Sequence, residues 1–112
     1  VNEVCTALGF KGFSGMLANQ IIAELEQNPQ WSEELNLAHC QDLANGGTLI
    51  VAGATGNPHG HVSVVCPGKI KVSGRWGQVP SVASVGAQNT IGLGLNWSYS
   101  VKPRTWIFRK TL

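Results

Sequence analysis

Charged residues are scarce in this sequence, and acidic residues are missing from its second half. Charged residues make up 12% of the 112 positions, about half of the ~25% share that is typical of soluble domains. The hydrophobic content of 43% excludes an intrinsically disordered chain. No apolar run approaches the ~20 residues of a membrane-spanning helix, and no signal peptide opens the chain as given. We therefore expect a soluble chain without a membrane partner.

The few charges are divided unevenly along the chain. Residues 1–50 carry six acidic residues and one lysine, whereas residues 51–112 carry seven basic residues and no acid. This division predicts either a face that attracts anions or an acidic helical layer packed on a basic sheet layer.

The three cysteines are too few for a disulfide framework, and their number is odd. Cys5, Cys40 and Cys66 are spaced by 35 and 26 residues, which matches no zinc-ligand pattern. At least one thiol must stay free or pair outside the chain. We expect buried structural thiols, above all Cys66 in its apolar run. A disulfide between Cys5 and Cys40 is the alternative, which the sequence does not decide.

Hydrophobic periodicity predicts helices in the first part of the chain. Helical spacing runs over residues 1–8, 14–27 and 32–45. Ser14 and Ser32 are suitable N-caps, and Asn45-Gly46-Gly47 is a typical helix end. In the third helix we expect the buried face to contain Leu35, Ala38 and Leu43.

After Gly47 the pattern changes to short apolar runs bounded by Gly and Pro, which are typical of strands. The runs are 48–52, 61–66, 69–72, 79–85, 95–100 and 105–109. Helices followed by strands predict an α+β fold in which N-terminal helices pack on a small antiparallel sheet. No linker or repeat divides residues 1–112, so we predict a single domain.

His61 is the histidine whose position best suits catalysis. It opens the strand predicted at 61–66, and Gly60 should leave the backbone in front of it open. A histidine there can act as base to a thiol or hydroxyl nucleophile, although an isolated one is more often an ordinary polar residue. His59 would project to the same side as His61, but no acidic residue follows Asp42 to complete a metal site. We predict no metal and no cofactor.

Three tryptophans alternate with basic residues in the second half of the chain. Trp76, Trp97 and Trp106 lie near Arg75, Lys102 and Arg104. Such a pattern suits stacking on sugars or single-stranded nucleic acid, but tryptophans in a small sheet more often form core or cleft wall. We expect no nucleic-acid partner; a nucleic-acid binder would lose affinity steeply with salt.

Two neighbouring segments carry a family resemblance. Ala44-Asn45-Gly46-Gly47-Thr48-Leu49-Ile50-Val51-Ala52-Gly53 is followed by His59-Gly60-His61-Val62-Ser63-Val64-Val65. They resemble the "A..G..V.AG" and "GHVAVV" strands of the amidase effectors of bacterial type VI secretion, in the NlpC-type branch of papain-like cysteine peptidases. Shorter similarities at Leu8-Gly9, Ala18-Asn19, Leu25-Glu26-Gln27, Trp31 and 80–86 extend it along the chain. The resemblance implies a papain-like NlpC-type fold in which His61 is the catalytic base.

The resemblance also implies where a nucleophile and an orienting group should lie. The family pattern C-x-x-F-V-x-x-V-x-x-x-L-G matches Val1, Val4, Leu8 and Gly9, which places the cysteine nucleophile four residues before Val1, on a missing or separate segment. Cys5 falls at a variable, mid-helix position, where it lacks the helix N-terminal dipole that activates a catalytic thiol. Ser84 best matches the group that orients the histidine, and a backbone carbonyl is the alternative.

By resemblance the substrate is a peptidoglycan stem peptide, cleaved at the D-glutamate–diaminopimelate bond. His59, Gly60 and Trp76 would line the substrate groove. The protein would be a secreted toxin that acts in the periplasm or extracellular space. Its candidate partners are a periplasmic immunity protein and a separate N-terminal fragment that carries the nucleophile. The alternative is a non-catalytic module on the same fold that binds cell wall or a polyanion.

Overall fold

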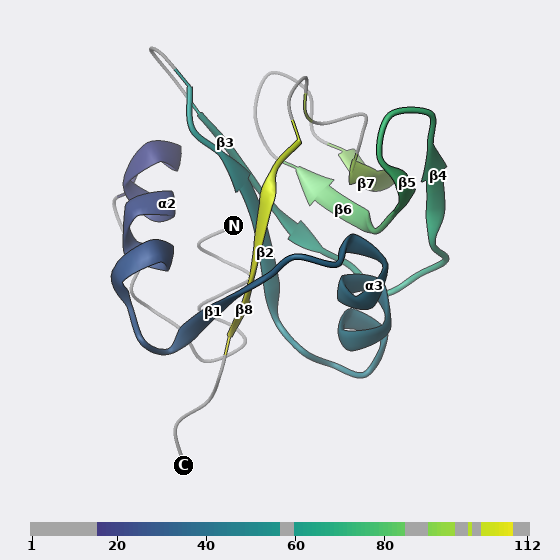
Figure 1. Cartoon of the computed structure of the whole chain (residues 1–112), viewed down its shortest axis with the longest axis horizontal. Coiled ribbons are helices and arrows are strands. Elements are labelled where there is room, and N and C mark those ends of the chain that lie inside the picture. The colour runs from purple at the N-terminus through teal and green to yellow at the C-terminus, as the bar shows by residue number, and fades with distance from the viewer. Residues whose placement is uncertain (1–15, 57–59, 85–89, 96–98, 100–101, 109–112) are drawn as a thin grey trace.

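The structure is a computed structural model, and it describes residues 16–56, 60–84, 90–95, 99 and 102–108. Its elements follow the chain in the order α2 (Ala18–Gln27), β1 (Trp31–Glu34), α3 (Leu37–Asn45), β2 (Ile50–Ala54), β3 (His61–Val65), β4 (Lys71–Ser73), β5 (Gly77–Val79), β6 (Ser81–Ser84), β7 (Thr90–Gly94) and β8 (Arg104–Phe108) (Figure 1). The chain is thus an α+β domain of helices packed on an antiparallel sheet, as the sequence predicts.

The main sheet of the described residues has the strand order β1-β8-β2-β3-β6-β7, and every neighbouring pair is antiparallel. β4 and β5 form a separate hairpin. β8 comes last in the chain but lies between β1 and β2, so the sheet joins residues from both ends of the described segment (Figure 1).

Helix α2 covers one face of the sheet. Its residues Ile21, Ile22 and Leu25 recur at helical spacing and are buried, so they form the apolar stripe that such a helix needs. The Gln20 side chain accepts a hydrogen bond from the Leu17 N–H at the helix start. The helix ends at Gln27, ahead of Asn28-Pro29, because a residue before proline disfavours the helical conformation. The buried stripe packs on Val51, Val64 and Trp106.

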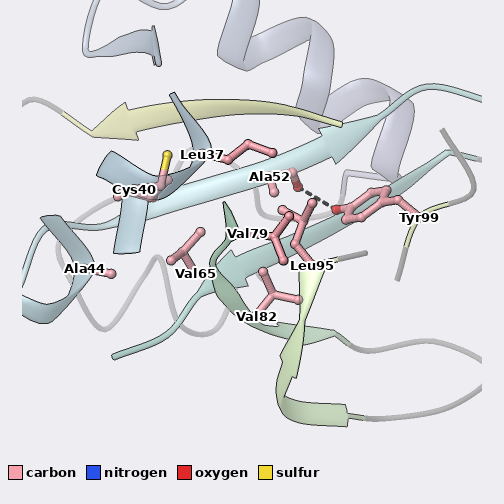
Figure 2. Close-up of a cluster of buried hydrophobic side chains, with 10 residues drawn as sticks. Leu37, Cys40, Ala44, Ala52, Val65, Val79, Val82, Leu95 and Tyr99 are labelled. Carbon is pink, nitrogen blue, oxygen red and sulfur yellow. Dashed lines mark hydrogen bonds between the residues drawn. The ribbon is translucent and has the colours of Figure 1, made fainter. Parts of the chain in front are cut away.

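Helix α3 and the β4–β5 hairpin lie on the opposite face (Figure 1). Figure 2 shows the second core cluster, in which Leu37, Cys40 and Ala44 of the helix meet side chains of the sheet, of β5 and of the segment after β7. The other members of this cluster are Ile50, Ala52, Val65, Val79, Val82, Leu95 and Tyr99. The sheet is therefore buried on both faces.

Gln41 of α3 is a buried polar residue that ties three elements together. Its amide nitrogen donates to the Cys66 carbonyl at 2.8 Å and to Asn45 Oδ1 at 3.0 Å. Its amide oxygen accepts from the Ser81 N–H at 2.8 Å. The bonds satisfy backbone groups at the end of β3 and the start of β6, where an unpaired buried group would be costly.

The helix predicted from Ser32 is wrong in its first turn. Residues Trp31–Glu34 form strand β1, and α3 begins at Leu37 with Asn36 as its N-cap. Pairing with β8 overrides the local helical pattern, because Trp31 becomes buried in that pair and Arg104 forms an ion pair with Glu33. The predicted end at Asn45-Gly46 is confirmed, with Gly47 at φ +93°.

The shift also changes the buried face of that helix. Leu35 precedes α3 and is 81% exposed, whereas Leu37, Cys40, Gln41 and Ala44 are buried. One strand prediction divides as well: residues 79–85 are shared between β5 and β6. Strand β7 at Thr90–Gly94 is not among the predicted runs, and most of the predicted run 95–100 lies outside the described residues. The helix predicted at 1–8 lies outside the described residues, as does Ser14.

Candidate functional site

His61 is the first residue of β3 and lies beside Ala54 of β2. The side chain is partly buried, and its ring centroid lies 5.2 Å from that of Tyr99 with the two planes tilted by 57°. Among the described residues, no side chain hydrogen-bonds to the imidazole. The predicted position of His61 at the start of a strand is confirmed.

The surroundings of His61 favour its neutral form. Burial removes water from the imidazolium, which lowers the pKa of His61 below its ordinary value. A histidine that is neutral near pH 7 can accept a proton from a nucleophile, and this is the state that a general base requires.

Tyr99 is the described residue whose ring packs against that of His61. Its hydroxyl donates a hydrogen bond to the Ala52 carbonyl at 3.0 Å (Figure 2). It also lies 2.8 Å from Ser63 Oγ, and both partners are fully buried. Burial raises the pKa of Tyr99 above its ordinary range, so the phenol stays protonated. The sequence pattern missed Tyr99; being the sole tyrosine of the chain was its only signal.

Ser84 lies on the strand next to His61. The β3–β6 register places Ser84 opposite Ser63, two residues along from His61. Diagonal neighbours of this kind are about 7–8 Å apart in a sheet.

The backbone around Gly60 is closely packed, and the expectation of open space in front of His61 is wrong at this position. A Cβ on Gly60 would meet Asn19 Oδ1 and would come within 2.6 Å of the Ala54 carbonyl oxygen. Asn19 also donates to the Gly56 carbonyl at 2.9 Å and accepts from the Gly56 N–H at 3.2 Å. Asn19 of α2 therefore holds the β2 end of the β2–β3 connection by hydrogen bonds and packs closely against Gly60 at its other end. His59 lies outside the described residues.

The three tryptophans have different environments. Trp106 is buried in the α2-side core, beneath Arg104 at 4.8 Å from its ring centroid. Trp76 is partly exposed, lines a cavity of about 520 Å³ and carries the Arg75 guanidinium over its ring at 4.5 Å. Trp97 lies outside the described residues. Trp76 is thus the described tryptophan that a ligand can reach.

Trp76 is connected to His61 through Tyr99. Arg75 donates to the Tyr99 carbonyl at 3.1 Å, and Trp76 packs against the core cluster that contains Tyr99. The predicted substrate-binding residue and the predicted base are therefore brought to the same side of the sheet, although they do not touch.

Neither described cysteine lies where it can share a proton with His61. Cys66 follows the opposite end of β3, a distance of about 16 Å along an extended strand. Cys40 is fully buried in α3, and burial raises the pKa of its thiol. Both thiols are free, and Cys66 is partly exposed, which corrects the prediction that it is the best-buried of the three. Cys5 lies outside the described residues.

In the part of the chain that the structure describes, no three His, Cys, Asp or Glu side chains gather as metal ligands. Neither α2 nor α3 has the length and apolar surface that a bilayer-spanning helix requires. Comparison with protein-family models gives no match, and a search of curated proteins gives no significant one.

Proposed function

We propose that this chain forms part of a cysteine amidase in which His61 is the catalytic base. The observation that carries the proposal is the partly buried imidazole at the start of β3, held against Tyr99 and neutral through burial. The sequence resemblance of residues 44–53 and 59–65 to type VI secretion amidase effectors points to the same residue independently. The papain-like NlpC-type assignment belongs to this proposal.

In the proposed reaction, a cysteine thiol transfers its proton to His61 and the thiolate sulfur attacks a peptide carbonyl carbon. The carbon–nitrogen bond then breaks, and the leaving amine takes the proton from the imidazolium. Water hydrolyses the thioester, with His61 again as base, to give a carboxylic acid and the free thiol. In this scheme the cysteine is the residue expected four positions before Val1, with Cys5 as the less favoured candidate.

Tyr99 and Ser84 have orienting roles in the proposal. Tyr99 packs against the imidazole and limits its rotation, because its own hydroxyl is held by Ala52 and Ser63. Ser84, one diagonal step from His61, is proposed as the hydrogen-bonding partner of the imidazolium, a role that a backbone carbonyl can also fill.

The proposed substrate is the peptidoglycan stem peptide, cut between D-glutamate and diaminopimelate. This assignment rests on the family resemblance and on the excess of basic residues after position 50. A protein with this activity would be secreted and toxic to bacteria, and a periplasmic immunity protein would protect the producer.

The test is digestion of purified peptidoglycan, with the soluble peptides separated by chromatography and identified by mass. It should be run on the 112-residue chain and on a form extended by any coding sequence upstream of Val1. His61→Ala should reduce product formation by about 10³-fold or more while the circular dichroism spectrum stays unchanged. Cys5→Ala should retain most of the activity.

The control is His39→Ala, which removes an exposed histidine whose ring lies 3.4 Å from Glu34. Equal activity of wild type and His61→Ala would overturn the proposal. If neither form releases peptides but both bind peptidoglycan, the non-catalytic binding module becomes the better assignment.

A further inference from the structure

The imidazole of His61 and helix α2 lie on opposite faces of the sheet. Along β3 the side chains alternate between the two faces. His61 and Ser63 lie on the side of Tyr99, whereas Val62 and Val64 belong to the core under α2. Helix α2 therefore reaches the imidazole through the backbone of β2 and β3 and not by direct contact.

Asn19 of α2 makes the contact with that backbone on the β2 side. Its side-chain amide donates to the Gly56 carbonyl at 2.9 Å and accepts from the Gly56 N–H at 3.2 Å. Gly56 lies two residues beyond Ala54, which is the last residue of β2 and the cross-strand partner of His61. The two hydrogen bonds therefore hold the chain just after it leaves the sheet.

On the β3 side, the residue before His61 is pressed against the same amide. A Cβ on Gly60 would clash with Asn19 Oδ1 and would lie 2.6 Å from the Ala54 carbonyl oxygen. Only a glycine allows so close an approach of backbone and side chain. Asn19 therefore lies against the chain on both sides of the Ala54–His61 pair.

The position of Asn19 is itself fixed by the packing of α2 on β2. Ile22 follows Asn19 by three residues, so the two side chains share one face of the helix. Ile22 packs on Gly53 of β2, where a Cβ would lie 3.0 Å from Ile22 Cγ1. Gly53 and Gly56 are also three residues apart, so α2 is docked at two successive points on the end of β2.

The Ala54–His61 pair needs this support because it ends the β2–β3 ladder. A terminal pair has no further pair beyond it and opens more readily than the middle of a strand. Opening would move the imidazole away from Tyr99 and expose it to water. The hydrogen bonds of Asn19, which join residues 37 positions apart in sequence, oppose that opening.

We propose that Asn19 is a positioning residue, which acts through Gly56 and Gly60 to hold the His61 imidazole against Tyr99. The inference rests on the proposed function for the role of His61 as a base. The positioning itself is a property of the folded chain and can be measured without substrate. It gives α2, a helix that does not contact the imidazole, a part in the candidate site.

The experiment follows the His61 imidazole of the 112-residue chain by NMR as the pH is changed. Tyr99 is the described titratable side chain that packs against the ring, and it stays protonated. The pKa of His61 therefore reports how well the ring is hydrated. Asn19→Ala should raise the pKa of His61 by about 0.3 or more, toward its ordinary value of about 6.5. The Gly56 amide, which loses its acceptor, should exchange faster with solvent.

Asn28→Ala is the matched control. Asn28 lies at the other end of α2 and also donates one side-chain hydrogen bond, to Glu24, and accepts one, from the Gln30 N–H. Alanine favours the helix in the Asn19 variant, and circular dichroism and chemical denaturation check that both variants fold. Asn28→Ala should leave the pKa of His61 and the exchange of the Gly56 amide unchanged. The inference is overturned if the two variants leave the pKa of His61 equally unmoved or shift it equally.

Hydrolysis of a soluble stem peptide separates this inference from the proposed function. In a form of the chain that is active, Asn19→Ala should lower kcat by about tenfold or more and leave KM nearly unchanged, because a displaced base slows the reaction without weakening binding. An equal loss of kcat in Asn28→Ala would overturn the inference. If Asn19→Ala moves the His61 titration as expected but wild type releases no product, the positioning role stands and the amidase proposal fails.

Discussion

The two faces of the sheet bury different types of side chain. The face under α2 is closed by apolar side chains alone in the main cluster, among them Ile22, Leu25 and Trp106. The face under α3 buries hydroxyl and amide groups as well, and each is hydrogen-bonded: Gln41, Ser63, Tyr99 and Thr105. An apolar face tolerates small displacements of its side chains, whereas a hydrogen-bonded one fixes them. The α3 side, which carries the Tyr99–His61 contact, is therefore the side suited to holding a catalytic geometry.

The largest expected effect comes from opening the α2 face. Leu25 is 1% exposed, and Leu25→Ala leaves a cavity beneath α2, so it should lower the free energy of unfolding by about 2–5 kcal/mol. Chemical denaturation measures this change. Leu17→Ala, on a side chain that is 67% exposed at the start of the same helix, should change it by about 0.5 kcal/mol or less. Equal effects would show that the α2 face does not form the core described above.

The next effect tests whether the α3 face depends on its hydrogen bonds. Gln41→Leu keeps the approximate size of the side chain but removes the hydrogen bonds to the Ser81 N–H and the Cys66 carbonyl. The loss should lower the free energy of unfolding by about 1–3 kcal/mol. Hydrogen exchange should show faster exchange of the Ser81 amide. Gln27→Leu, on an exposed glutamine of α2, is the control. A neutral Gln41→Leu would remove the distinction between the two faces.

A smaller effect is expected from the hydroxyl pair beside His61. Tyr99→Phe removes the bonds to Ala52 and Ser63 and should cost about 1 kcal/mol of stability. Since Ser63→Ala breaks the same contact, the double variant should be less destabilised than the sum of the single ones. Additive losses would mean that the two hydroxyls act separately and do not fix the ring together.

The smallest effect is a dependence of stability on pH. Because burial lowers the pKa of folded His61 below the ordinary value of about 6.5, the unfolded chain takes up the proton first as the pH falls. His61 should therefore not affect stability above about pH 6.5 and should reduce it progressively as the pH drops from there through the folded pKa.

Denaturation of wild type and His61→Gln at several values between about pH 7 and about pH 5 measures this contribution. The free energy of unfolding of wild type should fall relative to that of the variant as the solution becomes more acidic. A constant difference would show that His61 is as well hydrated in the folded chain as in the unfolded one.

The sequence predicts the parts of this fold that depend on local pattern. The stripe Ile21, Ile22 and Leu25 and the helix end at Asn45-Gly46 are local signals, and both are confirmed. Trp31–Glu34 carries a helix-like pattern but pairs with β8. That contact joins distant parts of the chain, so no local window contains it.

The residues of the candidate site also differ in whether local sequence predicts them. The position of His61 is predictable from the local sequence, because Gly60 precedes it and an apolar run that begins with Val62 follows it, which together indicate the start of a strand. Tyr99 takes its role from Ser63, a side chain that lies 36 positions away in sequence. Composition indicates a basic second half, but only the folded chain shows that Arg104 forms ion pairs with two glutamates, Glu26 and Glu33.

The place of β8 has a consequence for the order in which the molecule folds. β1 has its pairing partner 71 positions away, where Thr105 bonds to the Glu34 carbonyl. A chain leaving the ribosome exposes α2, β1 and the β2–β3 hairpin before residues 104–108 are made, so the gap between β1 and β2 stays unfilled until late in synthesis. Such long-range closure makes folding slow compared with that of a helical bundle. It also keeps the ion pairs of Arg104 with Glu26 and Glu33 from forming until the sheet is complete.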